Sequence, residues 1–474
     1  MNKIYNSLFL TMFKKTIILC AIIVSLNCSN AKAQIWTNQN ANFGKPTQGW
    51  SITTVNDSVA WTFGYTLDST IAAPDWGWTD EDLTFTRTSN GGNTWTTDTL
   101  PLGEPGSISN LSAISKQQAW ISHNDYNLGL SQVIHTVDGG TTWMEDTING
   151  ANWVNAIHFF DAKNGIAMYD NDGQDFELFT TVDSGHNWAQ VPAVNIPDIT
   201  AADEYGTTGS YTVSGNKIWF NTYNYDRIFY SIDKGQHWNV WDKPTNARGF
   251  GHQVEADESN NLYFTFYILG DSANSYTDSF MLFRRNLTDT SWTDLTPVNN
   301  VDYISGISRI PGTPNMIMNM GNTATVFKTK VSYDKGVTWI TIDTSLLKRG
   351  FVNFISPTVG YACELPSSYT NPSNYIFKYI GAAIVGLLHH TPIDLSIAVF
   401  PNPCVDYINI SLCKTNDDDF LILLNDIDGK LLEKRELNHV KNVHERMDMS
   451  RYAKGMYTIT VSNRKGTVSK KIIK

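Results

Sequence analysis

The stretch TVDGGTTW at residues 136–143 places an acid, two glycines and a tryptophan within eight positions. Its pattern is Ser or Thr, any residue, Asp or Asn, any residue, Gly, any two residues and Trp. We call each copy of this pattern a box, and the others are TSNGGNTW (88–95), TVDSGHNW (181–188), SIDKGQHW (231–238) and SYDKGVTW (332–339). Successive boxes start 48, 45, 50 and 101 residues apart. A period of about 40 to 50 residues with strand-like segments is typical of propeller blades.

The last interval is about twice the others, which indicates that one box has degenerated. RNLTDTSW at 285–292 lies in the expected place and keeps only Trp292. First strands are expected near residues 50, 108, 153, 211, 252, 304 and 352, which predicts seven blades. The seventh blade lacks a fourth strand, whereas IWTNQN at 35–40 resembles a fourth strand with no blade before it. We therefore expect the N-terminal strand to complete the last blade and close the ring.

Each box falls between the third and fourth strands of its repeat, where a tight turn is required. In the box at 136–143, Gly140 is suited to positive φ, Asp138 to accepting hydrogen bonds from amides of its own turn, and Trp143 to anchoring the hairpin. An acid occupied in this way is ionised and poorly placed to donate a proton. We interpret the boxes as scaffold, carried by Asn90 and Trp95, Asp138 and Trp143, Asp183 and Trp188, Asp233 and Trp238, and Asp334 and Trp339.

These boxes resemble the Asp-box, or BNR, repeats of sialidases, sortilins, xyloglucanases and the photosystem-assembly propellers. The resemblance covers residues 35 to 380 and implies the fold rather than a shared active site. Arg309-Ile310-Pro311 is similar to the Arg-Ile-Pro motif of sialidases, but that motif precedes the boxes in the family, whereas four boxes come first here.

After residue 393 the pattern changes to alternating apolar residues with turns at Asp428-Gly429 and near 463–466, which predicts a small antiparallel β-sandwich. The expected fold is therefore all-β, a seven-bladed β-propeller at 34–381 followed by a linker at 382–393 and a sandwich at 394–474. The sandwich resembles the type A C-terminal sorting domain of the Bacteroidetes type IX secretion system. The matching segments are Pro401-Asn402-Pro403, DIDGK (426–430), Gly455 with Tyr457, and KKIIK (470–474).

The N-terminus carries Lys14 and Lys15, the apolar stretch TIILCAIIVSL and then small residues up to Ala33, which is the order of a secretory signal peptide at 1–33. With the sorting-domain resemblance, this implies a protein that engages the type IX machinery and is secreted or attached to the outer-membrane surface. After the signal, Cys363, Cys404 and Cys413 remain, too few for a disulfide framework. Cys404 and Cys413 either bridge neighbouring strands or stay as thiols.

Composition narrows the classes of ligand. The chain has 474 residues, 33 glycines, 15 tryptophans and a net charge of −11, which describes an aromatic, turn-rich and acidic β protein. An acidic surface disfavours nucleic acid, because binding to phosphates depends on clustered Lys and Arg. No apolar run after residue 40 is long enough to span a membrane.

Sequence motifs for chemistry are few. There is no GxSxG, HExxH, P-loop or GxGxxG motif, and nothing indicates a cofactor. The segment DNDGQD contains three carboxylates that could bind calcium, those of Asp170, Asp172 and Asp175. An exposed acidic turn explains the same residues. A glycosidase needs only two carboxylates, and Asp75, Asp80 and Glu81 are the candidates for such a pair.

Long aromatic loops are expected on the face opposite the box turns. Their aromatic residues either stack on a sugar or peptide or only pack the loops: Tyr65, Trp76, Trp78, Tyr126, Tyr223, Tyr225 and Tyr276. We expect a non-catalytic binding or adhesion module for an extracellular glycan or protein. The alternative is an extracellular glycoside hydrolase, xyloglucanase-like or sialidase-like, with its carboxylates on this face.

Overall fold

The computed structural model describes residues 35–43, 47–67, 78–79, 83–102, 106–125, 129–146, 148, 152–247, 250–269, 276–296, 303–321, 327–364, 374–385, 396–426, 431–463 and 466–474. The expected signal peptide lies outside these residues. The chain forms two compact units, and the main boundary between them lies between Ile384 and Val385. The described residues contain strands and a single short 3-10 turn, η1 (Ala193–Asn195).

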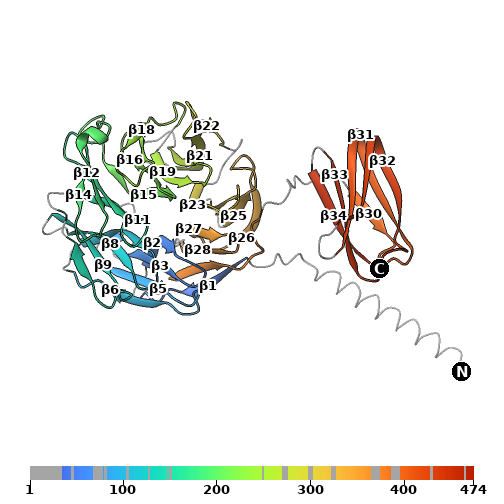
Figure 1. Cartoon of the computed structure of the whole chain (residues 1–474), viewed down its shortest axis with the longest axis horizontal. Coiled ribbons are helices and arrows are strands. Elements are labelled where there is room, and N and C mark those ends of the chain that lie inside the picture. The colour runs from blue at the N-terminus through green and yellow to red at the C-terminus, as the bar shows by residue number, and fades with distance from the viewer. Residues whose placement is uncertain are drawn as a thin grey trace, which may run out of the picture. The chain divides into compact units, whose positions relative to one another are not determined.

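In the described part of the first unit, the strands form antiparallel sheets of four, one with a short additional strand, arranged around a central axis (Figure 1). In every sheet but the last, the innermost strand comes first along the chain and the other main strands follow in order; in the last sheet, the outer strand comes from the start of the chain. The innermost strands are β2 (Thr47–Thr54), β7 (Gly106–Ala113), β11 (Val154–Phe159), β15 (Gly206–Ser214), β19 (Phe250–Ala256), β23 (Tyr303–Arg309) and β27 (Arg349–Ser356).

The second strands are β3 (Ala60–Leu67), β8 (Ala119–Asp125), β12 (Gly165–Asn171), β16 (Lys217–Thr222), β20 (Asn261–Leu269), β24 (Met316–Gly321) and β28 (Val359–Glu364). The third strands are β5 (Thr84–Thr88), β9 (Leu130–Thr136), β13 (Phe176–Thr181), β17 (Ile228–Ser231), β21 (Tyr276–Asn286), β25 (Phe327–Ser332) and β29 (Tyr375–Tyr379). The outer strands are β6 (Thr96–Thr99), β10 (Met144–Asp146), β14 (Ala189–Gln190), β18 (Asn239–Trp241), β22 (Thr293–Asp294), β26 (Ile340–Ser345) and β1 (Trp36–Asn40), and β4 (Trp78–Thr79) pairs with β3.

Neighbouring innermost strands contact one another in a closed cycle, β2, β7, β11, β15, β19, β23, β27 and back to β2. The last sheet takes its outer strand from the start of the chain, because β1 pairs antiparallel with β29 from Trp36 opposite Tyr379 to Asn40 opposite Tyr375. This pairing confirms the strand predicted at residues 35–40. It leaves β29 with hydrogen-bonded neighbours on both sides.

Aromatic side chains fill the space between adjacent sheets. Trp120 of β8 stacks on Phe159 of β11 with ring centroids 3.6 Å apart, and Phe85 of β5 meets the edge of Trp143 at 5.3 Å. Trp95, from the first sheet, packs against Tyr361 of the last sheet at 6.1 Å. Buried aromatic surface of this kind dominates the energetics of a core. The box tryptophans Trp95 and Trp143 therefore join sheets as well as hairpins.

The box turns have the same geometry in all five copies. The fifth residue has positive φ each time, from 82° at Gly92 to 95° at Gly185, as predicted for Gly140 at 87°. A Cβ at Gly140 would also lie 2.7 Å from the ring of Phe85, so the turn approaches the neighbouring sheet closely. Asp138 accepts hydrogen bonds from the amide of Thr142 at 2.9 Å and from the Thr142 hydroxyl at 2.7 Å. These hydrogen bonds lower the pKa of Asp138 to about 2.

The second unit contains one five-stranded antiparallel sheet made of β30 (Ser396–Phe400), β31 (Tyr407–Asp426), β32 (Leu431–Asp448), β33 (Met456–Asn463) and β34 (Gly466–Ile473). The first half of β31 pairs with β30 and its second half with β33, with register shifts against β32 between Cys413 and Phe420. Its core includes Ile408, Ile410, Ile422, Leu424 and Ile459. Cys363 and Cys404 are free buried thiols, so the bridge considered for Cys404 is not formed.

Segments that define the sorting-domain resemblance meet at the C-terminal strand. The Asn402 side chain donates to the carbonyl of Lys471 at 2.7 Å and accepts from the amide of Ile473 at 2.9 Å. The amide of Gly455 donates to the carbonyl of Lys474 at 3.1 Å, and the amide of Lys474 returns a bond at 2.9 Å. These contacts fix the last residues of the chain in the sheet.

Candidate functional site

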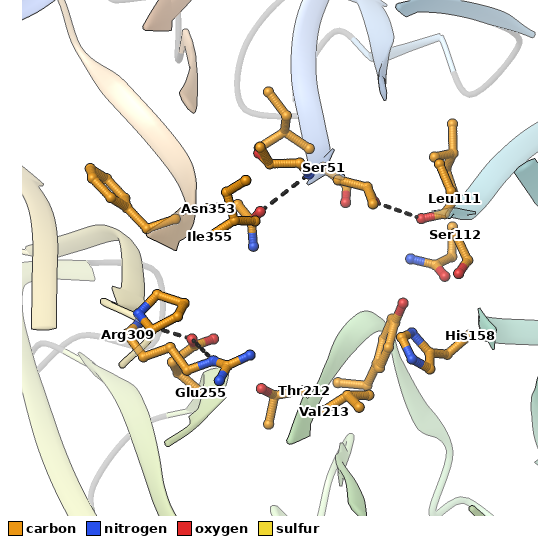
Figure 2. Close-up of a pocket in the computed structure, with 18 of the residues that line it drawn as sticks. Ser51, Leu111, Ser112, His158, Thr212, Val213, Glu255, Arg309, Asn353 and Ile355 are labelled. Carbon is orange, nitrogen blue, oxygen red and sulfur yellow. Dashed lines mark hydrogen bonds and ion pairs between the residues drawn. The ribbon is translucent and has the colours of Figure 1, made fainter. Parts of the chain in front are cut away.

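The innermost strands surround a cavity of about 510 Å³ at their C-terminal ends. All of the innermost strands contribute to its lining. Figure 2 shows Glu255 and Arg309 on the other side of this space from Leu111, Ser112 and His158. Because the strands of each sheet are antiparallel, this end of the cavity lies on the same face as the box turns.

A ring of hydrogen bonds joins the sheets around this cavity. At five junctions a side-chain oxygen on one innermost strand accepts from a backbone amide on the next, and the acceptors are Asn110, Thr212, Glu255, Ser308 and Asn353. At the other two junctions a side-chain hydroxyl, of Thr53 or Tyr211, donates to a backbone carbonyl of the neighbouring strand. Glu255 thus occupies a position that is filled by neutral groups elsewhere in the ring.

Arg309 is the positive group of the cavity. Its Nη1 lies 2.7 Å from Glu258 Oε1 and its Nε lies 3.7 Å from Glu255 Oε1. Burial raises the pKa of Glu255 to about 7, and the charge of Arg309 opposes this rise. The two carboxylates share one guanidinium instead of facing each other across a cleft. This cluster fits a structural role in the ring.

His158 does not supply a second charge to the cavity. Burial lowers the pKa of its imidazole to about 4, so it is neutral near pH 7. Its ring packs edge-on against Phe160 at 4.8 Å and Tyr211 at 5.7 Å. The cavity therefore has a polar rim, one shared arginine and a neutral histidine.

A second pocket, of about 290 Å³, lies between the sheets of β11 and β15. Aromatic side chains of Trp153, Tyr205 and Tyr223 line it together with Asp170. Tyr205 is 43% exposed and Tyr223 is 52% exposed. The starts of β11 and β15 and the ends of β12 and β16 form this pocket, so it opens on the face opposite the box turns. We call it the aromatic pocket.

The carboxylate of the aromatic pocket is held by the fold. Asp170 Oδ1 accepts from Asn155 Nδ2 at 2.7 Å and from the amide of Gly206 at 3.0 Å. Burial raises the pKa of Asp170, and both hydrogen bonds oppose the rise. The Trp153 indole donates to the Thr208 hydroxyl at 3.3 Å. An acceptor fixed among aromatic rings suits the orientation of a hydroxylated ligand.

A buried glutamate fixes the wall that carries the two tyrosines. Glu204 is fully buried and binds Arg227 Nη1 at 2.8 Å, the Thr222 hydroxyl at 2.9 Å and the amide of Thr200 at 2.6 Å. The amide of Tyr223 donates to the carbonyl of Tyr205 at 2.7 Å. Because these bonds exist without a ligand, little ordering is required on binding.

Among the predicted stacking residues, Tyr223 lines the aromatic pocket, whereas Tyr65 and Tyr225 do not. Tyr65 packs against Trp50 at 5.0 Å and donates to the carbonyl of Ile108 at 3.0 Å. Tyr225 donates to Asp203 at 3.1 Å, which raises its pKa. The remaining candidates lie outside the described residues or have side chains outside them: Asp75, Trp76, Trp78, Asp80, Glu81, Tyr126 and Tyr276.

The three carboxylates considered for calcium are not brought together. Asp170 belongs to the aromatic pocket, while Asp172 accepts from the amides of Gln174 at 3.0 Å and Asp175 at 3.2 Å in its own turn. Burial raises the pKa of Asp175, and the charges of Asp198 and Asp172 add to this. Within the described residues, no group of three metal-ligand atoms includes any of these carboxylates.

Sequence reasoning missed Trp153 and Tyr205. Both residues immediately precede an innermost strand, in a connection between sheets, whereas the prediction concentrated on loops between second and third strands. The closed ring brings the two kinds of connection together on one face. The aromatic residue at the same place in two successive repeats was the available signal.

Comparison with family models matches residues 398–474 to a secretion system C-terminal sorting domain. The match runs from within β30 to the end of β34 and agrees with the predicted type IX sorting domain. The protein is secreted or attached to the outer-membrane surface. No helix among the described residues is long and apolar enough to cross a membrane. A search of curated proteins found no significant match.

Solved structures similar to this chain include YCF48 bound to D1 peptide, at 14% identity and a TM-score of 0.52 over 74% of this chain and 98% of that one. A GH74 enzyme of Niastella koreensis matches at 11% identity and a TM-score of 0.48 over 92% and 67% of the two chains. The β-propeller domain of the Trilobed protease from Pyrococcus furiosus matches at 8% identity and 0.42 over 74% and 99%. At 14% identity, the likeness to YCF48 extends to the fold alone.

Proposed function

We propose that the first unit is a seven-bladed Asp-box propeller that acts outside the cell as a non-catalytic binding module for a glycan. The aromatic pocket is the observation that carries this proposal. A sugar ring has apolar C–H faces and hydroxyl edges, so it requires aromatic surface together with a fixed acceptor. Trp153 and Tyr223 supply the surface and Asp170 the acceptor.

The pocket favours binding over catalysis. Among the described residues, Asp170 is the only carboxylate that lines it, and its Oδ1 accepts hydrogen bonds from Asn155 and Gly206. A glycosidase requires a second carboxylate about 5 to 10 Å away across the scissile bond. The small volume of about 290 Å³ fits recognition of one or two rings at a chain end or branch.

The alternative is a glycoside hydrolase that uses Asp75, Asp80 or Glu81. These acids occur in the sequence of the connection between β3 and β5, which joins a second to a third strand and so begins and ends on the face of the aromatic pocket. Binding and cleavage are therefore measured in the same experiment.

The test is a glycan array and a set of plant and host polysaccharides, probed with the mature chain while reducing-end release is assayed in parallel. Binding without release is expected. Tyr223→Ala and Trp153→Ala should each weaken binding about tenfold or more, because each removes apolar surface against which a sugar ring would pack, and burial of a large apolar side chain is worth about 1.5 to 3 kcal/mol.

The control is Val194→Ala, at a side chain that is 92% exposed and does not line the pocket. Its binding should equal that of the wild type. Glycan binding that survives both aromatic substitutions would place the site elsewhere. Release of reducing ends that disappears on Asp80→Asn or Glu81→Gln would replace the binding module with a hydrolase.

A further inference from the structure

Two histidines and an aspartate from adjacent sheets converge away from both pockets. His135 lies on β9, Asp146 on β10 and His186 in the box turn 181–188 of the next sheet. One ligand atom from each lies within 4.8 Å of the others. His135 Nδ1 is 2.7 Å from Asp146 Oδ2, and the two imidazole rings meet edge-on at 5.4 Å.

The fold holds these side chains in place. The side chains of His135 and Asp146 are only 3% and 2% exposed, whereas His186 is exposed and leaves a route from solvent. A Cβ at Gly185 would lie 2.9 Å from Asp146 Oδ2, so the box turn passes directly over the carboxylate. The carbonyl of Ser184 in that turn accepts from the Trp120 indole at 3.0 Å.

The repeats provide an internal comparison for this cluster. Scaffold positions recur from sheet to sheet, as the box residues do, but this combination does not. Three positions define the cluster: the residue before a box, the third residue after the box tryptophan, and the sixth residue of the next box. For the boxes that start at 88, 136 and 181, the residues at these positions are, in turn, Arg87, Asp98 and Thr141; His135, Asp146 and His186; and Thr180, Val191 and Gln236. Only the second set supplies three ligand side chains, so the turn architecture does not require it.

The buried carboxylate of Asp146 indicates that a ligand bound by these three side chains would be a cation. Burial raises the pKa of Asp146, and the hydrogen bond and charge of His135 oppose this rise, with His186 adding a smaller effect. A buried carboxylate is costly unless it is paired, and a cation between it and the two imidazoles would offset that cost. Two imidazole nitrogens and one carboxylate oxygen are a donor set suited to borderline divalent transition ions.

We propose that His135, Asp146 and His186 bind a divalent transition-metal ion of the Zn²⁺ class and thereby cross-link the second and third sheets of the propeller. The three protein ligands leave a further coordination position toward the exposed side of His186. A site of this form retains an exchangeable water or takes a donor from outside. The site is independent of the aromatic pocket and of its ligand.

The experiment is calorimetric titration of the metal-free full-length mature chain with Zn²⁺, with Co²⁺ binding followed by its visible spectrum as a second readout. Wild type should bind Zn²⁺ at this site and show Co²⁺ bands of a low-coordinate nitrogen and oxygen site. His186→Ala should lose one equivalent or weaken it at least tenfold. Because His186 is exposed, the variant should fold, and Asp146→Asn provides a second test with little change in shape.

The control is His237→Ala. His237 is an exposed histidine in the following box, with its Nδ1 2.7 Å from Asp233 Oδ2, and no third ligand group joins this pair within the part of the chain that the structure describes. Its substitution should leave Zn²⁺ binding unchanged. Equal Zn²⁺ binding by wild type and His186→Ala, or absence of binding by the wild type at micromolar Zn²⁺, would overturn the proposal.

Discussion

Substitution of Glu255 by glutamine should stabilise the propeller at high pH and not at low pH. Glu255 accepts the amide of Arg309 at 2.9 Å, and a glutamine oxygen preserves that bond, as the amides Asn110 and Asn353 do elsewhere in the ring. The pKa of Glu255 is raised to about 7 from an ordinary 4.5. A raised carboxyl pKa means that protonation favours the fold, with the full benefit below about pH 4.5 and none above pH 7.

The size of the effect follows from the same shift. One pKa unit corresponds to about 1.4 kcal/mol, so an ionised Glu255 costs roughly 2 to 3 kcal/mol above pH 7, allowing for residual solvent screening. Glu255→Gln removes this cost. Its urea midpoint should therefore exceed that of the wild type at pH 8.5 and approach it at pH 4.5.

Tryptophan fluorescence is the assay for this prediction. All 15 tryptophans precede residue 340, so none lies in the sorting domain and the signal reports the propeller sheets. Glu258→Gln is the matched control, because Glu258 pairs with the same Arg309 but its side chain is 46% exposed. It should gain less at high pH than Glu255→Gln, because the charge of Glu258 is a minor contribution to the raised pKa of Glu255. A change in the Glu255→Gln midpoint that is the same at both pH values would refute the reasoning.

Two further predictions concern the box turn and the sorting domain. Asp138→Ala should lower the thermal midpoint of the tryptophan signal more than Asp138→Asn, because asparagine keeps an acceptor for the Thr142 amide, as Asn90 does for Thr94. The lowered pKa of Asp138 stabilises the fold above about pH 4, and this stabilisation is lost as the pH falls toward 2. The difference in thermal midpoint between wild type and Asp138→Asn should therefore narrow on acidification. A difference that stays constant would contradict this explanation. Asn402→Ala should reduce the amount of protein outside the cell and increase cell-retained protein on immunoblots, because it removes both bonds to the last strand. Val405→Ala, at a side chain 74% exposed, is the control, and equal export of both variants would argue against a role for this contact.

The sequence predicts the repeated sheets well because the recurring boxes mark equivalent positions in successive sheets. Five boxes at nearly constant spacing locate the third and fourth strands, and the unmatched strand at 35–40 identifies the partner of β29. The second unit is harder to predict in detail. The long β31 changes partners along its length, and that exchange depends on register shifts without a sequence motif.

The candidate sites were less accessible to prediction because their residues meet only after the ring closes. The sequence offers Asp170 as a candidate calcium ligand and Tyr223 as a candidate stacking residue, but their placement in one pocket depends on the packing of β12 and β16. The histidine and aspartate cluster joins residues 135, 146 and 186, which show no metal-binding spacing. Comparison of equivalent positions across repeats reveals it, once the register is known.

The pairing of β1 with β29 has a mechanical consequence. β29 is the last strand of the propeller before the segment that leads to the sorting domain, and it is hydrogen-bonded to β28 on one side and to β1 on the other. Tension transmitted along the chain from a surface-attached sorting domain would enter the propeller through this strand. Removal of β29 then requires two ladders to break instead of the one that holds an edge strand, so closure of the ring also reinforces the point at which a tethered propeller is pulled.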